Sequence, residues 1–385
     1  MAPQFLSILF FLAAVRYQCD CAVGRRRLGK FIKHFEPLYY DPDSLHKIHR
    51  RAVESRTDGD FEFSAFGKFH RLKLRPDRGI FTRDAEILSG DGKPLPFDRD
   101  SVVKGHVEGQ PSSDVYGVID KQDGFHGKIL SGSVNYYVDP SSWYFDEKQD
   151  FPSVIYKDED LEYDHSFADI NQRVPSVPVP ERVRRSPANE DRRRRQVSQE
   201  ELEKNVCTLG LYADNFFTEL FGGKTKAIFE LVKQIQAAQI IYMNEFNSSD
   251  YFSPFGITFR VKTMVAFNKS DPLPSNLPAQ VKDINVGIDT LLDLFSSMNH
   301  QGVCEAFLFT NRDFEGGILG LAWIGDPKGE AAGGICDKYQ NYGGKQRSYN
   351  TGVVTMKLYG RFTPPRISEI TFAHELGHGF GSQVC

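Results

Sequence analysis

The sequence predicts an α/β protein with two folded parts, a β-rich first part followed by a part in which strands and helices alternate. A length of 385 residues suffices for about two domains of ordinary size. Polar and apolar residues alternate in several segments between residues 60 and 156, whereas strand-like and helix-like patterns take turns after residue 201. The net charge of −4 provides no overall electrostatic basis for binding nucleic acid.

The amino-terminal end carries a largely apolar run over residues 5–15, followed by small and polar residues and a basic cluster at residues 25–27. Such a run is too short to span a bilayer, which takes about 20 residues. We interpret residues 1–21 as a signal peptide, with a buried terminal helix or strand as the alternative. The chain as given is therefore expected to enter the secretory pathway and to be secreted.

The first folded part is assigned to residues 22–173. Alternation predicts strands at Phe61–Phe63 and Phe69–Leu74, and the segment Val134–Val138 follows a glycine turn. Its histidines stand singly, without the spacing of metal ligands, and are expected to be packed or exposed side chains.

Residues 174–200 combine spaced prolines with two basic runs that end at Arg185 and Arg195. Such a segment has too few apolar residues to fold, so we interpret it as a disordered linker. Behind a signal peptide, both runs are candidate cleavage sites for a furin-like convertase, and Arg195 is favoured because it lies nearer the first strand of the second part. In a chain made in the cytoplasm, the same runs would instead indicate a nuclear signal or an anion-binding patch.

In the second part, residues 201–385, segments with the apolar pattern of a strand alternate with segments that have the apolar spacing of a helix. Strands are expected at residues 206–212, 257–266, 306–309, 316–325 and 352–356. Helical spacing predicts helices over residues 228–242 and 283–298, and Pro364–Pro365 introduces a last helix that reaches Phe380. The apolar faces of these elements are expected to form the core.

The last helix carries the pattern His374-Glu375-Leu376-Gly377-His378. Residues four apart project from one face of a helix, so both imidazoles can reach one ion with Glu375 beside them. Neutral imidazoles are good zinc ligands, and a carboxylate beside the ion can take a proton from water and deliver it to a leaving amine. The pattern predicts Zn2+ ligands at His374 and His378 and a catalytic acid/base at Glu375; an ordinary amphipathic helix is the alternative.

Several segments make the second part similar to the catalytic domain of the ADAM (reprolysin-type) metzincins, specifically the Kuzbanian-type sheddases. These segments are Thr310–Phe314, Leu319–Gly325, Gly333–Cys336 and Ile370–His378. The first part resembles the propeptide of that type through Asp43–His46 and Ser153–Asp160. The resemblance implies a metzincin-like mixed sheet with helices behind a β-rich propeptide.

The resemblance also implies a zinc metalloendopeptidase that acts on proteins. The residues that match the family's cleft-edge strand, on which an extended substrate pairs main chain to main chain, are Leu319, Gly320, Leu321, Ala322 and Trp323. A disulfide between Cys207 and Cys304 is implied as well. The full-length form would be a cell-surface membrane protein that sheds the ectodomains of membrane proteins, including Notch-pathway components.

The sequence departs from the family pattern in three respects. Val384 stands where a third zinc-binding histidine is expected, and the family's Met-turn would lie beyond Cys385, so the catalytic domain is interpreted as truncated after the zinc helix. Residues 22–206 contain no cysteine that could hold the site latent. We therefore expect weak zinc affinity and little hydrolysis, and the alternative function is an inactive isoform or relative that binds substrate or propeptide without cleaving.

Overall fold

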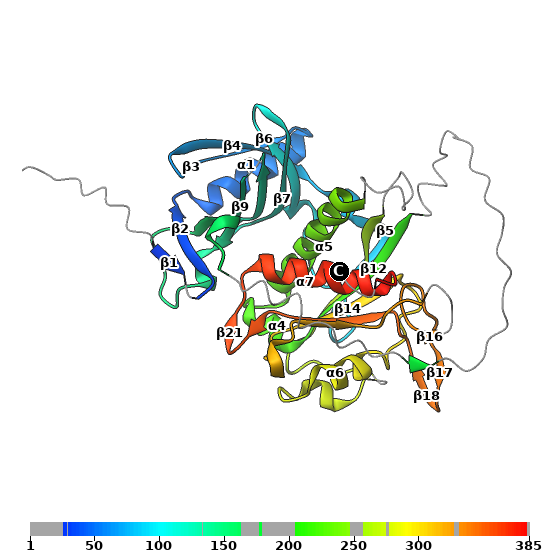
Figure 1. Ribbon diagram of the computed structural model, residues 1–385. Coiled ribbons are helices and arrows are strands. Elements are labelled where there is room, and N and C mark those ends of the chain that lie inside the picture. Colours follow the sequence, from blue (N-terminus) through cyan, green and yellow to red (C-terminus); the bar gives the residue numbers. More distant parts are fainter. Residues whose placement is uncertain are drawn as a thin grey trace, which may run out of the picture.

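The computed structural model describes residues 26–28, 30–132, 134–162, 177–178, 205–246, 257–274, 277–326 and 331–382. The expected signal peptide, both basic processing sites and Val384 lie outside these residues. The predicted α/β class is confirmed, because two large sheets are packed around helices (Figure 1). Within the described residues, no helix is both long enough and apolar enough to cross a membrane.

The first sheet is antiparallel and has nine strands in the order β1-β2-β10-β9-β8-β7-β6-β4-β3. Its strands are β1 (Arg26–Leu28), β2 (Ile32–Leu38), β3 (Gly59–Ala65), β4 (Lys68–Pro76), β6 (Val102–Val107), β7 (Gln110–Asp120), β8 (Gly124–Ser131), β9 (Val134–Pro140) and β10 (Ser153–Lys157). The three strand segments predicted in this part lie in β3, β4 and β9. Short 3₁₀ turns follow at Arg78–Ile80, Arg99–Ser101, Ser141–Trp143 and Asp158–Asp160.

One helix, α1 (Pro42–Ser55), belongs to this sheet. The Asp41 side chain accepts a hydrogen bond from the Ser44 backbone and so caps the first turn, and Pro42 stands at the start of the helix. The helix buries Leu45 and Ala52 against the sheet. The first folded unit therefore begins at β1 and includes a helix, which the strand patterns did not predict.

The second sheet has six strands in the order β15-β19-β14-β12-β13-β5. They are β15 (Gly320–Ala322), β19 (Thr351–Thr355), β14 (Glu305–Thr310), β12 (Val206–Ala213), β13 (Thr258–Ala266) and β5 (Phe81–Ser89). All neighbouring pairs are parallel except β15 and β19, which are antiparallel. The sheet is therefore mixed, as the family resemblance implied.

Strand β5 comes from the first part of the sequence but belongs to the second sheet. Ile87 pairs with Met264 and Ser89 with Ala266, so β5 covers the edge of β13. Phe81, Ala85 and Ile87 are buried in the core of the second sheet. Residues 60–156 consequently do not form one self-contained β unit, because this strand joins the two parts of the chain.

Helices cover both faces of the second sheet. They are α4 (Asn215–Leu220), α5 (Lys224–Phe246), α6 (Ile288–Phe295) and α7 (Pro365–Gly379). Alternate residues of β14 face opposite layers: Phe307 and Phe309 pack with residues of α5 and α7, and Leu308 packs with residues of α6. Figure 1 shows α5 and α7 between the two sheets.

The second predicted helix is shorter than expected, since the prediction covered residues 283–298 and α6 spans only Ile288–Phe295. The Asp283 carboxylate accepts a hydrogen bond from the Asn285 backbone and stabilises a turn there. Gly287 then caps the helix. Likewise, the strand predicted over residues 316–325 is reduced to β15, because residues 315–317 form a 3₁₀ turn with positive φ at Gly316.

Three small two-stranded sheets complete the fold. They pair β17 (Gln340–Tyr342) with β18 (Lys345–Arg347), β20 (Lys357–Leu358) with β21 (Arg361–Phe362), and β11 (Val177–Pro178) with β16 (Ala331–Ala332). Strand β11 lies within residues 174–200, the segment interpreted as a linker. Its backbone is paired with the second part of the chain.

Candidate metal centre

Helix α7 provides the rigid support for the candidate metal centre. Pro365 occupies the first turn, where its missing N–H costs nothing, and the helix ends at Phe380. Gly381 has a φ of 93°, and the Gly381 and Ser382 backbone amides bond back to the carbonyls of His378 and Gly377. A glycine at this position allows the left-handed turn that ends the helix.

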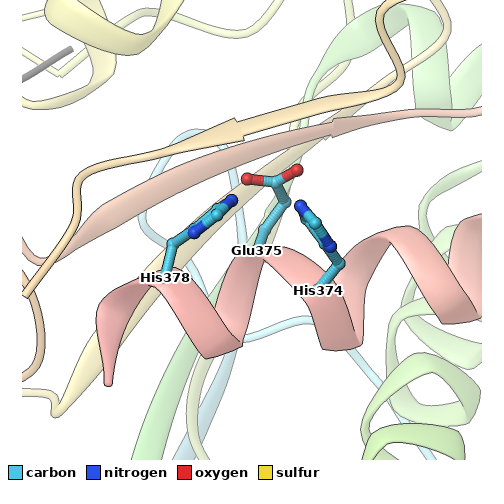
Figure 2. A group of neighbouring side chains, drawn as sticks. All are labelled: His374, Glu375 and His378. Carbon is cyan, nitrogen blue, oxygen red and sulfur yellow. The ribbon is translucent and has the colours of Figure 1, made fainter. Parts of the chain in front are cut away.

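The two histidines and the glutamate of α7 lie on the same face of the helix (Figure 2). The possible ligand atoms of His374, Glu375 and His378 all lie within 4.8 Å of one another, and the imidazole ring centroids are 4.6 Å apart. Helical spacing of four residues produces this arrangement. It is the one such group found among the described residues.

The histidine side chains are suited to bind a metal. Burial, followed by the neighbouring His378, lowers the pKa of His374 to about 4, so its ring is neutral at physiological pH. Nδ1 of His378 lies 2.7 Å from the Ser382 carbonyl oxygen, to which it donates a hydrogen bond in the tautomer that leaves Nε2 for an ion. A neutral, oriented imidazole is the form that coordinates zinc and related metals.

Glu375 is buried, with 1% of its surface exposed, and its Oε1 has no hydrogen-bond partner among the described residues. Burial raises the pKa of the Glu375 carboxyl group well above its usual range. Burying such a group without a partner is unfavourable for folding. A cation and a water molecule at this position would provide the interaction partners that the Glu375 carboxylate lacks. The side chains therefore fit a bound metal.

The predicted cleft-edge strand lies directly beside Glu375. A Cβ atom added to Gly320 would come within 2.5 Å of Glu375 Oε1, so glycine is required for the strand to approach the helix. Further along, the Gly325 amide donates a hydrogen bond to the His378 carbonyl at 2.8 Å. β15 pairs with β19 on one side and is the last strand of its sheet. Its other side is the edge on which the resemblance placed substrate.

The structure contains a disulfide between Cys207 and Cys304, with a Cα–Cα distance of 5.3 Å. It joins the start of β12 to the residue before β14, and the Cys304 amide also bonds to the Thr208 carbonyl. Cys336 is exposed and is the free cysteine of the described residues.

Sequence reasoning missed Glu305, a second buried carboxyl group near the centre. It is fully buried on β14, and neither carboxylate oxygen has a hydrogen-bond partner in the described part of the chain. Burial and the nearby Glu375 charge raise its pKa well above the usual range. Its carboxylate packs against Gly379, where any side chain would collide with it. A charged residue directly after a cysteine in an apolar strand was the signal available.

Comparison with known proteins agrees with this geometry. Residues 203–383 match the model of Metallo-peptidase family M12. Disintegrin and metalloproteinase domain-containing protein 10 of Homo sapiens is 34% identical over 381 residues, which cover 92% of this chain and 49% of that protein. The Xenopus laevis protein of the same name is 32% identical, with the same coverage, and the Caenorhabditis elegans homolog is 27% identical over 92% of this chain and 44% of its own length.

Fold, site and similarity define a metallopeptidase of the M12 class. The chain is similar to the ADAM metalloproteases of reprolysin type, and in particular to disintegrin and metalloproteinase domain-containing protein 10 of several species. It spans about half the length of these relatives.

Proposed function

We propose that this chain is the precursor of a zinc-dependent endopeptidase that cleaves protein chains, with His374 and His378 as zinc ligands and Glu375 as catalytic acid/base. The observation that carries the proposal is the grouping of these three side chains on α7 beside the edge strand β15. Neither the helix motif nor an edge strand alone would define a peptidase. Their adjacency brings an extended backbone to a proton-transfer group.

The residues of the chain have separate roles in this mechanism. The outer edge of β15 orients an extended substrate by main-chain hydrogen bonds, which fixes one peptide bond over α7. Zinc, when bound, supplies Lewis acidity and lowers the pKa of water. Glu375 takes a proton from the attacking water and delivers it to the leaving amine nitrogen. Its burial and raised pKa suit it to hold that proton between the two transfers.

The same proposal covers the maturation of the protein. Residues 1–21 act as a signal peptide, residues 22–173 as a propeptide, and a furin-like convertase cuts the linker 174–200 after Arg195 or Arg185. Residues 201–385 then carry the metalloprotease domain. In the full-length form, similarity to the Kuzbanian-type relatives supports a cell-surface protease that sheds ectodomains of membrane proteins, including Notch-pathway components.

Val384 favours a second candidate function, a form that binds substrate or propeptide without cleaving. Two imidazoles hold the ion where three are expected, and loss of even an outer-shell partner costs about 10- to 100-fold in metal affinity or activity. Removing a ligand is expected to cost at least that much.

The test compares the purified chain with Val384→His and with Gln383→His, which adds a histidine at the wrong spacing. Each protein is treated with a furin-type convertase and assayed on an unfolded protein substrate, with zinc or with a chelator. We expect Val384→His to cleave at least about 10-fold faster than the other two, and the chelator to abolish cleavage. Cleavage that survives the chelator, or its absence in all three, contradicts the endopeptidase proposal. Equal, chelator-sensitive cleavage by all three contradicts the non-cleaving form.

A further inference from the structure

We propose that Phe31 is a plug that keeps the metalloprotease site closed in the precursor, by filling an apolar pocket at the start of the cleft-edge strand. The inference rests on the proposed function, since it concerns the regulation of that site. It assigns latency to an aromatic side chain, in a chain whose residues 22–206 contain no cysteine to coordinate the metal.

Phe31 belongs to the first part of the chain, but its side chain packs against residues of the second part. It lies in the turn between β1 and β2, and its carbonyl accepts a hydrogen bond from the Glu162 amide at 2.8 Å. Its neighbour Ile32 forms a bridge with Leu161. The turn is therefore held by backbone bonds to the first part, while its side chain is only 7% exposed.

The pocket that receives Phe31 is built by three residues of the second part. They are Leu319, Leu358 and Ile367, which are 5%, 1% and 7% exposed. Leu319 immediately precedes β15, and Ile367 lies in the first turn of α7. Phe31 thus packs against the residue that precedes the cleft-edge strand and against the first turn of the metal-site helix. In this proposal, a substrate strand that pairs with the outer edge of β15 meets Phe31 beside Leu319, at the start of that strand.

A second contact holds the same end of α7. Lys128 Nζ of β8 lies 3.6 Å from Glu369 Oε2, and both side chains are nearly fully buried. The Tyr116 hydroxyl of β7 is 3.5 Å from Glu369 Oε1. Figure 1 shows β1, β2 and the start of α7 on the same side of the molecule. A buried ion pair contributes little net affinity, because both charges lose their hydration. The pair between Lys128 and Glu369 therefore serves to align the two parts of the chain. The apolar contact of Phe31 is then the one that favours closure at this end of α7.

Hydrogen exchange of the full chain tests the plug without zinc or hydrolysis. Phe31→Ala is compared with Phe69→Ala, a matched control, because Phe69 lies on β4 of the same sheet and is 63% exposed. We expect amides of residues 319–323 and 357–370 to exchange at least about 10-fold faster in Phe31→Ala, and to be unchanged in Phe69→Ala. Ile367→Ala removes the opposite wall of the pocket and gives the same result if Phe31→Ala does not fold.

The plug proposal is overturned if the amides exchange no faster in Phe31→Ala and Ile367→Ala than in Phe69→Ala. Hydrolysis separates this outcome from failure of the proposed function. In the Val384→His background, Phe31→Ala is expected to cleave substrate before convertase treatment, whereas Phe69→Ala requires the treatment. If exchange accelerates but no variant cleaves, the plug stands and the peptidase proposal fails. If uncut Phe31→Ala stays inactive while convertase-treated protein cleaves, the plug does not control the site.

Discussion

Asp139 of the first sheet and Glu305 of the second are both buried carboxyl groups, but they differ in their partners. The Asp139 Oδ2 accepts hydrogen bonds from the hydroxyls of Tyr144 and Tyr156, each at 2.7 Å. Neither oxygen of Glu305 has a partner among the described residues. Burial raises the pKa of both groups.

This difference shows in which part of the fold a carboxyl group is buried without hydrogen-bond partners. Asp139 organises two tyrosines inside a sheet whose role is structural, and it stabilises the fold. Glu305 and Glu375 lie close enough for the charge of one to affect the pKa of the other, and each has a buried oxygen without a partner. Unpartnered polar atoms at the metal centre are typical of a site that is completed by a ligand.

The largest expected effect is the loss of hydrolysis on removing Glu375. In the active Val384→His background, Glu375→Ala is expected to lower kcat/KM by roughly 10²- to 10⁴-fold, the usual contribution of a general acid/base. Stability is expected to change little, because no hydrogen bond to Oε1 is lost. Peptide cleavage and denaturant unfolding measure the two quantities. Unfolding of Glu375→Ala would show that this carboxyl group is structural, like Asp139.

Asp139→Ala is expected to destabilise the protein by about 2–4 kcal/mol, because two buried tyrosine hydroxyls lose their acceptor. Urea unfolding, followed by tyrosine fluorescence, measures the change. Asp139→Asn is the control, since its amide oxygen still accepts a hydrogen bond and is expected to lose less. A change below about 0.5 kcal/mol in Asp139→Ala would contradict the structural role.

Glu305→Leu is expected to have the opposite sign and to stabilise the protein by about 1–3 kcal/mol, because it replaces an unpartnered buried carboxyl group with an apolar side chain of similar size. Glu305→Gln keeps a polar group in the same place and is expected to gain less. Thermal unfolding of the three proteins measures the effect. Destabilisation by Glu305→Leu would indicate that the carboxyl group has a partner or a function.

The smallest expected effect is the dependence of the protein's stability on pH. The pKa of Glu305 is raised in the folded protein from 4.5, so the folded state holds a proton that the unfolded state releases. Its contribution to stability is fully present below pH 4.5 and is lost as pH rises towards the folded pKa, by at most about 1.4 kcal/mol per pH unit. The stability advantage of Glu305→Leu is therefore expected to grow with pH above 4.5. An advantage that shrinks over this range would contradict the assignment.

Local patterns predicted most elements of the second part. Strands β12, β13, β14 and β19 and helix α5 lie where apolar patterns placed them. Helix α7 begins at Pro365, where the pair Pro364–Pro365 predicted its start. Helix α6 was overestimated, since the turn at Asp283 depends on one side-chain hydrogen bond.

The pairing of distant segments could not be predicted in this way. Strand β5 has an ordinary alternating pattern, and nothing in Phe81–Ser89 specifies that its partner is β13, about 175 residues later. The burial of Phe31 against Ile367 is equally invisible in sequence, because the contact exists only once both parts have folded. Motif spacing predicted the group on α7; its metal, the ligand roles and the domain limits remain predictions.

The central claim is that α7 holds zinc through His374 and His378. The most direct measurement is zinc binding by the purified chain at equilibrium, by dialysis and metal analysis, compared with the double variant His374→Ala/His378→Ala and with Val384→His. We predict that the double variant loses bound zinc and that Val384→His binds it at least about 10-fold more tightly than the unmodified chain. Zinc binding by the double variant equal to that of the unmodified chain would contradict the claim.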